Sequence, residues 1–521
     1  MYPSREKRLL KRATEIQPEA SEGSGGRSPR PHSGNQLSEG RAVKRSLLRP
    51  GLLALALTGL GLPGAVTTSG TAAPAAAPVP PVELVVAPVV DVNRYDGWVY
   101  GDLGPRLAAT TAPVELWSTR TSYADPIVTE LRSPGGSTTL PAGTLKDFRG
   151  LPRFYRMTLR NKAGDIVYNK VRRYCMNGDS QRMRPDAPAR SPYPWGCPWH
   201  PFTKGSVQGI QEGWSVSLTG EQAMRLKTGR YSARVAIAER YAELFGLSDA
   251  QRVTTYTLRV RNGGDESFRK PVAPRSPIAR PNARRPKGAS GGVVAGPTPD
   301  LQSLPAFGMS IAPGGNFLRF SATVWNAGDS PLVVDGFRRP GEDVMDAYQY
   351  FFDADGNQTG YAHVGEMEWH AANHQHWHFH DFARYRLLRA SDQSAVVRSK
   401  KESFCLANTD AVDYTVPGAE WKPENTDLSS ACGGRDTLSL REVLSQGSGD
   451  TYMQFRAGQS FNLKGVPNGW YYVAVEANPT GHLTETDTTN NVALRKIHIG
   501  GRPDHRTVRM SQVGIVDDSS F

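Results

Sequence analysis

One short segment of the chain carries histidine at every second position. These residues are His374, His376, His378 and His380. Only an extended strand turns alternate side chains to one face, so the spacing predicts a β-strand whose other face carries Trp377 and Phe379 into a core. Four charged imidazoles on one face would repel one another, and buried ones without partners would be costly. The pattern therefore predicts a metal site. Neutral imidazole suits copper, zinc, iron or nickel, and affinity favours copper.

The remainder of the chain is patterned for β-structure in two regions, 82–261 and 300–499. Short alternating runs such as 154–159 are broken by turn signals. Residues 262–299 are rich in Pro, Gly and Arg and are predicted to form a linker, and residues 500–521 are predicted to form a C-terminal tail. The sequence therefore predicts an all-β protein with two tandem β-sandwich domains. We refer to them as the first and second β regions.

Two motifs recur in the same order in both β regions. Lys170–Cys175 is matched by Lys400–Cys405, and Gly229–Val235 is matched by Gly469–Val475. The first β region has a single histidine, His200, and nothing like the histidine strand. We therefore interpret it as a degenerate sibling of the second β region.

The four cysteines divide evenly between the two β regions. The simplest pairing is local, Cys175 with Cys197 and Cys405 with Cys432, although the sequence leaves the other two pairings open. Disulfide bonds imply an oxidising compartment. That inference agrees with the pattern of an export signal near the N-terminus.

Residues 41–77 are typical of an export signal. Basic residues precede a short apolar run, Gly51–Leu62, and small residues follow at Ala72–Ala77. The apolar run is too short to span a membrane, and no later segment is long and apolar enough. Residues 1–40 are polar and basic, which predicts a disordered extension. We therefore expect a secreted protein without a transmembrane segment after signal removal.

The net charge of +12 raises the question of an anionic partner. Nucleic acid is the usual partner of a basic protein, but much of the excess charge lies in the N-terminal extension and the linker. No nucleic-acid-binding motif is present. We expect no nucleic-acid partner, and a cationic surface would suit association with an anionic cell envelope.

The second β region resembles lysyl oxidase, a copper amine oxidase of the extracellular matrix that also has bacterial members. The copper strand of that family reads W-x-W-H-x-C-H-Q-H-x-H. Residues 367–378 read MEWHAANHQHWH, with one extra residue before the histidine triplet and no Cys. The copper ligands that the resemblance implies are His374, His376 and His378. His370 and His380 are then neighbouring or surface groups.

The resemblance also implies an organic cofactor, lysine tyrosylquinone, which the family builds from its own chain. A tyrosine is oxidised at the copper and a lysine amine adds to its ring. The family's K-A-S-F-C-L segment corresponds to Lys401–Leu406, and its C-Y-D-T-Y segment corresponds to Ser448–Tyr452. The cofactor would therefore form from Lys401 and Tyr452. Taken singly, these residues would be read as a surface lysine and a packed strand tyrosine.

The first β region lacks all of these groups together. Counted from its first cysteine, Val171 occupies the position of Lys401, and Trp214 that of Tyr452. This joint absence is expected if the metal strand, the lysine and the tyrosine serve one function. We therefore interpret the first β region as non-catalytic.

The implied activity is oxidation of peptidyl-lysine or other primary amines to aldehydes by dioxygen, with release of hydrogen peroxide and ammonia. The family has a histidine in E-F-S-H-Y-D-L-L, where this chain has Arg384 within Asp381–Leu388. Arginine stays protonated and cannot act as a base, so Asp381 or His380 would have to replace it. The alternative function is a non-enzymatic copper-binding protein of the cell envelope.

A calcium site is a further implication of the resemblance. Some members hold calcium with a closing E-S-D-Y-T-N-N and an early Asp-Leu. This chain has the corresponding residues at both ends of the second β region, and oxygen ligands of this kind suit calcium. The implied ligands are Asp300, Leu301, Glu485, Asp487, Asn490 and Asn491. The alternative interpretation is an Asn-rich hairpin turn.

Overall fold

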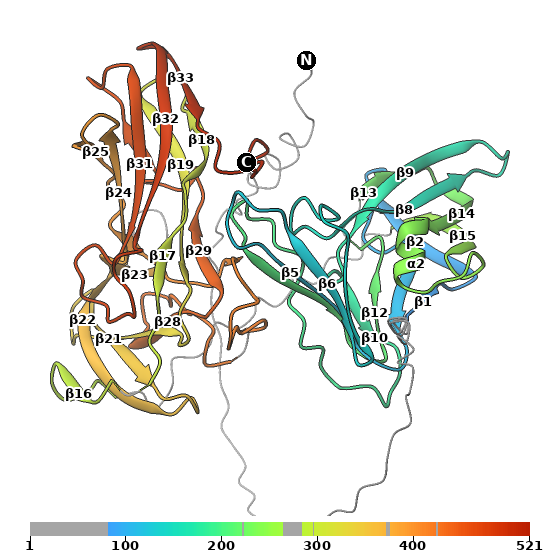
Figure 1. The fold of residues 1–521 in the computed structure, drawn as a ribbon, viewed down its shortest axis with the longest axis horizontal. Coiled ribbons are helices and arrows are strands. Elements are labelled where there is room, and N and C mark those ends of the chain that lie inside the picture. The colour runs from blue at the N-terminus through green and yellow to red at the C-terminus, as the bar shows by residue number, and fades with distance from the viewer. Residues whose placement is uncertain (1–81, 221–222, 264–283, 295, 371–375, 424–425) are drawn as a thin grey trace, which may run out of the picture. The chain divides into compact units, whose positions relative to one another are not determined.

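The structure is a computed structural model that describes residues 82–220, 223–263, 284–294, 296–370, 376–423 and 426–521 (Figure 1). Nearly all regular elements in these ranges are strands, and they contain one α-helix, α2 (Glu239–Leu244). The all-β prediction is confirmed. The predicted extension, the export signal, much of the linker and His374 lie outside the described residues. No described helix is long and apolar enough to cross a membrane.

The first β region forms three sheets, whose strand orders are β1-β4-β12-β10, β11-β5-β6-β7 and β13-β3-β2-β15-β14-β8-β9. Its strands are β1 (Val82–Val85), β2 (Val89–Tyr95), β3 (Trp98–Tyr100), β4 (Arg106–Ala109), β5 (Val114–Thr119), β6 (Val128–Ser133), β7 (Gly136–Thr139), β8 (Leu151–Arg160), β9 (Ile166–Tyr174), β10 (Ser180–Arg182), β11 (Gly205–Ile210), β12 (Trp214–Ser217), β13 (Ala223–Arg225), β14 (Gly229–Ile237) and β15 (Val253–Asn262).

The second β region also forms three sheets. Their orders are β26-β23-β22-β21-β20-β28 with β16 beside β22, β17-β19-β29-β27 with β18 and β30 beside β19, and β25-β24-β31-β32-β33. The strands are β16 (Ser290–Gly292), β17 (Leu301–Ser303), β18 (Phe307–Ile311), β19 (Phe317–Asn326), β20 (Leu332–Arg338), β21 (Val344–Phe352), β22 (Gln358–His370), β23 (His376–His380), β24 (Ala383–Arg389), β25 (Ala395–Arg398), β26 (Ser403–Phe404), β27 (Asp410–Ala411), β28 (Ser439–Leu444), β29 (Ser448–Tyr452), β30 (Ser460–Asn462), β31 (Gly469–Ala477), β32 (Val492–Arg502) and β33 (His505–Met510).

Two of these sheets correspond between the regions. The order β1-β4-β12-β10 matches β17-β19-β29-β27, and β9-β8-β14-β15 matches β25-β24-β31-β32. The matched motifs begin β14 and β31 with Gly229 and Gly469, which have φ of 147° and 153°. Two residues further on, Tyr231 and Tyr471 each donate a hydroxyl hydrogen bond of 2.7 Å to the carbonyl four residues upstream. These parallels support one repeated plan, while the exact domain bounds stay a prediction.

The predicted linker and tail both contain strands. β16 lies within 262–299 and pairs with β22. Residues 500–521 include the end of β32 and all of β33, which form a hairpin. Strand β33 thus pairs antiparallel with β32. In the first region the strand that corresponds to β32 is β15, and its partner β2 pairs with it in parallel. The repeated plan therefore holds for the centre of this sheet and differs at its edge.

Each β region has its own large apolar core, and a smaller cluster joins them. In that cluster Phe202 of the first region packs with Phe307, Trp325 and Val412 of the second. The backbone N–H of Lys204 donates to the carbonyl of Val412 at 2.7 Å. The single histidine of the first region, His200, is buried here, with Nε2 2.9 Å from Oγ1 of Thr323.

Both local disulfide bonds are present. Cys175 joins Cys197 with Cα atoms 5.9 Å apart, and Cys405 joins Cys432 with Cα atoms 5.8 Å apart. The simplest pairing predicted from the sequence is confirmed. The second of these bonds lies beside the candidate site.

Candidate functional site

The histidine strand β23 lies inside its sheet, between β22 and β26. Its register places Glu368 opposite His378 and Phe404 opposite Phe379. Trp377 and Phe379 are fully buried in the core of the second β region, as the alternation predicted. His378 faces the opposite way and is only 1% exposed. The strand is therefore paired along both edges and its Trp377–Phe379 face is packed in the core, which fixes the direction of its imidazoles.

His376 and His378 point their ring nitrogens at one another. Their Nε2 atoms lie 2.9 Å apart. Two imidazoles bound at about 2.0–2.1 Å to one metal, about 90° apart as in tetragonal copper, have nitrogens separated by about 2.9 Å. Nδ1 of His378 lies 3.2 Å from the hydroxyl of Ser403, and such contacts orient a ligating imidazole. These two histidines fit a copper site.

His380 has a different neighbour. Its Nε2 lies 3.2 Å from Oε2 of Glu368, so this imidazole faces a carboxylate. The third predicted ligand, His374, lies outside the described residues. Two of the three predicted copper ligands, His376 and His378, therefore lie among the described residues.

Lys401 and Tyr452 meet, although 51 positions separate them in the sequence. The Lys401 side chain is 7% exposed, and its Nζ lies 4.3 Å from the centre of the Tyr452 ring. The same Nζ donates a hydrogen bond of 3.0 Å to the carbonyl of Ser403. Gly458 packs against the lysine, since a Cβ at that position would come within 3.3 Å of the Lys401 Cβ.

The backbone of Cys405 holds the Tyr452 hydroxyl. The hydroxyl accepts a hydrogen bond of 2.8 Å from the N–H of Cys405 and donates one of 3.1 Å to its carbonyl. The Phe404 ring stands edge-on to the tyrosine ring, with centres 5.1 Å apart. The disulfide to Cys432 anchors this segment, so the ring of Tyr452 is held on the strand β29 in a fixed orientation.

Ser403 connects the metal strand to the lysine. Its hydroxyl lies beside His378 and its carbonyl accepts the Lys401 hydrogen bond. Because β26 pairs with β23, this serine is held directly against the histidine strand. Two of the histidines, the lysine and the tyrosine singled out from the sequence thus gather into one site.

The site is electrostatically unusual because it is buried. Burial lowers the pKa of the Lys401 amine to about 8, with a smaller lowering by Arg456 and an opposing effect of Asp450. Burial and the nearby Asp450 raise the pKa of the Tyr452 hydroxyl well above its usual value. Lys401 therefore supplies a neutral amine at a far lower pH than an exposed lysine would.

Buried carboxyls beside the cofactor pair were missed by the sequence interpretation. Asp450 is 3% exposed and shares a face of β29 with Tyr452, two residues further on. Within the described residues its Oδ2 has no hydrogen-bond partner. Burial raises the pKa of Asp450 well above its usual value, against the opposing charge of Lys401. The signal was available, because this aspartate belongs to the motif that identified Tyr452.

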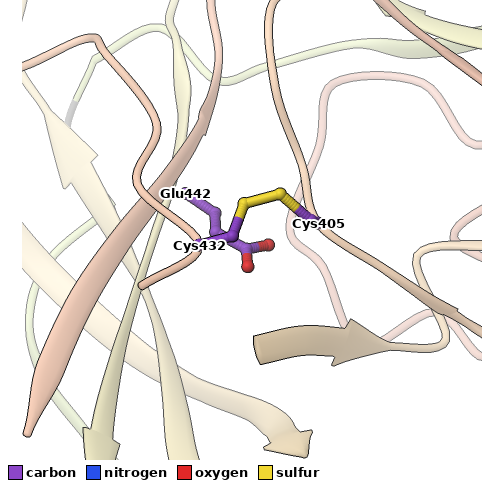
Figure 2. A group of neighbouring side chains, drawn as sticks. All are labelled: Cys405, Cys432 and Glu442. Carbon is purple, nitrogen blue, oxygen red and sulfur yellow. A yellow bond between two sulfur atoms is a disulfide. The ribbon is translucent and has the colours of Figure 1, made fainter. Parts of the chain in front are cut away.

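Glu442 is a second buried acid, and it lies against the Cys405–Cys432 disulfide (Figure 2). Its Oε2 accepts a hydrogen bond of 2.9 Å from the N–H of Leu406. Burial raises the pKa of Glu442 well above its usual value. The two sulfur atoms and this carboxylate are close enough to resemble a metal site. However, sulfurs joined in a disulfide offer no thiolate ligand.

Asp381, which we predicted as the base, lies in the turn between β23 and β24 with φ of 58°. Its backbone N–H donates to the carbonyl of Glu402 at 3.0 Å. Arg384, which stands where the family has histidine, lies 3.9 Å from Glu476. Among the described carboxyls, Asp450 is the one that interacts electrostatically with both Lys401 and Tyr452. The role of Asp381 stays a prediction.

Most of the predicted calcium ligands also lie together. The N–H of Leu301 donates to Glu485 at 2.9 Å, and the Asn490 amide donates to Asp300 at 3.0 Å. The Oδ1 atoms of Asn490 and Asn491 are buried and lack a hydrogen-bond partner among the described residues. Such unpartnered oxygens beside carboxylates fit a calcium ion.

Asp487 behaves differently from the other predicted calcium ligands. It is exposed, and its carboxylate accepts hydrogen bonds of 2.8 and 2.6 Å from the backbone and hydroxyl of Thr489. This is the geometry of the alternative hairpin turn. The segment 485–491 therefore combines a turn with a group of oxygen atoms that join the two ends of the second β region.

Residues 357–508, which carry the whole of this site except part of the calcium group, match the lysyl oxidase family. Protein-lysine 6-oxidase of Sus scrofa is 34% identical over 135 residues, which are 26% of this chain and 47% of that protein. Lysyl oxidase homolog 1 of Homo sapiens is 35% identical over 136 residues, 26% of this chain and 21% of that protein.

Protein-lysine 6-oxidase of Rattus norvegicus is 34% identical over 135 residues, 26% of this chain and 29% of that protein. The chain thus spans less than half the length of these curated relatives. The second β region belongs to the lysyl oxidase family.

Proposed function

We propose that this protein is a secreted, copper-dependent amine oxidase whose cofactor forms from Lys401 and Tyr452. One observation carries the proposal: the buried Lys401 amine lies 4.3 Å from the centre of the Tyr452 ring, beside a strand of histidines. A lysine over a tyrosine ring alone could be a structural cation–π contact, but Ser403 joins this pair to the histidine strand through His378. The family match and the disulfides, which suit export, support the same proposal.

His376 and His378, with His374, would hold the copper. Copper and the lysine tyrosylquinone would supply redox chemistry in which a primary amine, dioxygen and water give an aldehyde, ammonia and hydrogen peroxide. The chain's own residues prepare the reactants. Ser403 directs the lysine amine toward the ring, and the backbone of Cys405 holds the tyrosine hydroxyl. Burial keeps the amine partly neutral, which is the nucleophilic form.

We assign the general base of amine oxidation to Asp450, with Asp381 as the alternative. Asp450 has a carboxylate oxygen beside the cofactor pair that lacks a hydrogen-bond partner among the described residues, and burial raises its pKa, which makes the carboxylate a stronger base. In Asp450→Asn, kcat should fall by about 10²–10⁴-fold while the Lys401–Tyr452 cross-link still forms. The isotope effect for an amine deuterated at the reacting carbon should grow. A loss of that size in Asp381→Asn, with Asp450→Asn unaffected, would reverse the assignment.

The substrate we propose is peptidyl-lysine or another primary amine, in line with the names of the relatives. Calcium would join the two ends of the second β region through the oxygen atoms described above. Association with an anionic cell envelope would follow from the basic charge of the chain. The first β region would be non-catalytic, since it has Val171 and Trp214 in place of the cofactor pair.

The test is amine-dependent release of hydrogen peroxide from copper-loaded, aerated protein, with n-butylamine and a lysine-containing peptide as substrates. We expect peroxide and aldehyde in equal amounts, both abolished in Lys401→Met. The second candidate function is a copper-binding envelope protein, which the replacement of the family histidine by Arg384 favours. It predicts bound copper, no peroxide and no adduct with phenylhydrazine.

A further inference from the structure

The seven-stranded sheet of the first β region carries a set of arginines on one exposed face, remote in sequence from the cofactor pair. Arg156 and Arg160 project from β8, and Arg230 and Arg234 project from the neighbouring strand β14. All four side chains are exposed. Each pair is separated by four positions on its strand, so all four point to the same side of the sheet.

The register interleaves the arginines with small and hydroxyl side chains. Arg234 lies opposite Thr158, and Arg160 lies opposite Ser232. The guanidinium groups therefore stand on diagonals, at about 7–8 Å between the backbone positions of neighbours. The result is a zigzag of positive charge along two strands with hydroxyl groups between them.

Two hollows follow this zigzag, and they share Arg156 and Arg234. One, of about 370 Å³, is also lined by Arg153, Arg240 and Arg252. The other, of about 390 Å³, is also lined by Arg160, Thr158, Ser232 and Thr255. No carboxylate lines either hollow. A ligand lying along both would meet positive charge and hydrogen-bond donors throughout.

Among the residues that the structure describes, the four strand arginines have no carboxylate partner, whereas Arg252, which also lines the first hollow, pairs with Asp249 at 2.6 Å. Arg156 donates to the amide oxygen of Asn169 at 3.0 Å, and Arg160 donates to the carbonyl of Gly164 at 2.9 Å. No ion pair is formed by Arg156, Arg160, Arg230 or Arg234 within the described ranges. By contrast, Arg261 at the far side of the same sheet pairs with Asp91 at 3.1 Å. Unpaired like charges on neighbouring strands destabilise a sheet, so an external anion would stabilise this one.

We propose that this face, which we call the arginine face, binds a linear phosphodiester polymer that carries no bases. Guanidinium groups bind phosphate in a bidentate manner through its two non-bridging oxygens, and each of these oxygens keeps a lone pair that can accept a hydrogen bond from a neighbouring hydroxyl such as that of Thr158 or Ser232. Phosphate and carboxylate both accept a bidentate arginine, so polyglutamate is the competing probe in the test below. Single-stranded nucleic acid would need exposed rings for base stacking, whereas Tyr155, the aromatic residue among the described lining of the hollows, is fully buried.

The proposal is tested with the full chain and immobilised poly(glycerol phosphate) as the probe. In Arg156→Gln/Arg234→Gln, affinity at 50 mM salt should fall at least about tenfold, and the slope of log affinity against log salt should decrease by about 2. The matched control is Arg190→Gln/Arg225→Gln, which removes the same charge from exposed positions of the same region. Its affinity should stay within about twofold of the parent protein, since neither control side chain lines the hollows.

Three results would overturn the proposal. Equal weakening by both double substitutions would mean that net charge alone attracts the polymer. Tighter binding of single-stranded DNA of the same charge would identify a nucleic-acid site. Equal binding of polyglutamate would mean that phosphate is not recognised. Thermal unfolding of both variants shows whether the sheet is intact, and Arg156→Lys/Arg234→Lys, which keeps the charge, replaces the first variant if it is not. That pair should still lose affinity because lysine lacks the bidentate fork.

Discussion

Two sheets correspond between the two β regions, and the regions differ at the segment before the first cysteine. In the first region, β9 continues without a break from Ile166 to Tyr174, and Val171 is an ordinary strand residue. In the second region, the corresponding strand β25 ends at Arg398, and the chain leaves the sheet before β26 begins at Ser403. That break turns Lys401 inward, toward Tyr452. A shared scaffold thus gains a candidate reactive pair by interrupting one strand.

The disulfide bonds, one in each β region, extend this comparison. Both bonds close similar loops, with sequence separations of 22 and 27 residues. In the second region the backbone of the first cysteine holds the hydroxyl of Tyr452. Its counterpart, Trp214, donates its ring N–H to the carbonyl of Pro188 instead. The disulfide is therefore common structure, and the tyrosine is what the second region adds.

The largest loss of amine oxidase activity should come from replacing Tyr452. Tyr452→Phe removes the oxygen from which a quinone forms and should abolish peroxide release, while leaving the ring packed against Phe404. The matched substitution in the sibling region, Trp214→Phe, should leave activity within about twofold of the parent, as surface changes usually do. Amine-dependent peroxide release measures both. Activity in Tyr452→Phe would contradict the assignment of the cofactor.

The next largest effect should be on copper binding by the histidine strand β23. His378→Asn should weaken copper binding by at least about 100-fold, because a ligand contributes more than its neighbours, whose loss costs about 10–100-fold. His505→Asn is the control, since His505 is exposed on β33. Copper content after dialysis against a chelator compares the two proteins. Equal copper retention would separate the histidine strand from metal binding.

The pH dependence of cofactor formation should follow Lys401. The amine attacks only when neutral, and its pKa of about 8 lies below the usual value, so the neutral fraction rises as pH increases toward 8. The rate of cross-link formation should increase about 50-fold between pH 6 and pH 8 and level off above that. The measurement is the growth of quinone absorbance after copper addition at each pH. A rate that keeps rising to pH 10 would indicate an ordinary lysine.

The smallest effect tests whether the two regions are built alike. Tyr231→Phe and Tyr471→Phe each remove a hydrogen bond of 2.7 Å at the same place in the repeated plan. Each should lower the free energy of unfolding by about 1 kcal/mol. Chemical denaturation of both variants, with copper absent, provides the comparison. Clearly unequal losses would weaken the structural correspondence between the regions.

The sequence predicted those features that a local pattern determines. The alternation of histidines with aromatic residues predicted that Trp377 and Phe379 are buried. The residues around Lys401 and Tyr452 were recognisable as motifs. The pairing of Cys405 with Cys432 followed from proximity in the chain. By contrast, the pairing of Ser403 with both His378 and Lys401 depends on β26 lying beside β23, which no local pattern determines.

The burial of two carboxyl groups was another property that could not be predicted from the sequence. No local pattern around Asp450 and Glu442 indicates burial, yet both are buried beside the site. Their altered acidity arises from desolvation by elements far away in the chain, including β19 and β20. The arginine face was concealed for the same reason, because it depends on the register between β8 and β14.

The most direct test of the central claim is peptide mass spectrometry of copper-loaded, aerated protein, searching for a covalent bond between Lys401 and Tyr452. We predict one cross-linked peptide pair, absent from protein prepared without copper and absent from Lys401→Met. Recovery of both peptides unmodified from protein that retains copper and has been aerated across pH 7 to 9 would contradict the claim, and would leave a copper-binding protein on a lysyl oxidase scaffold.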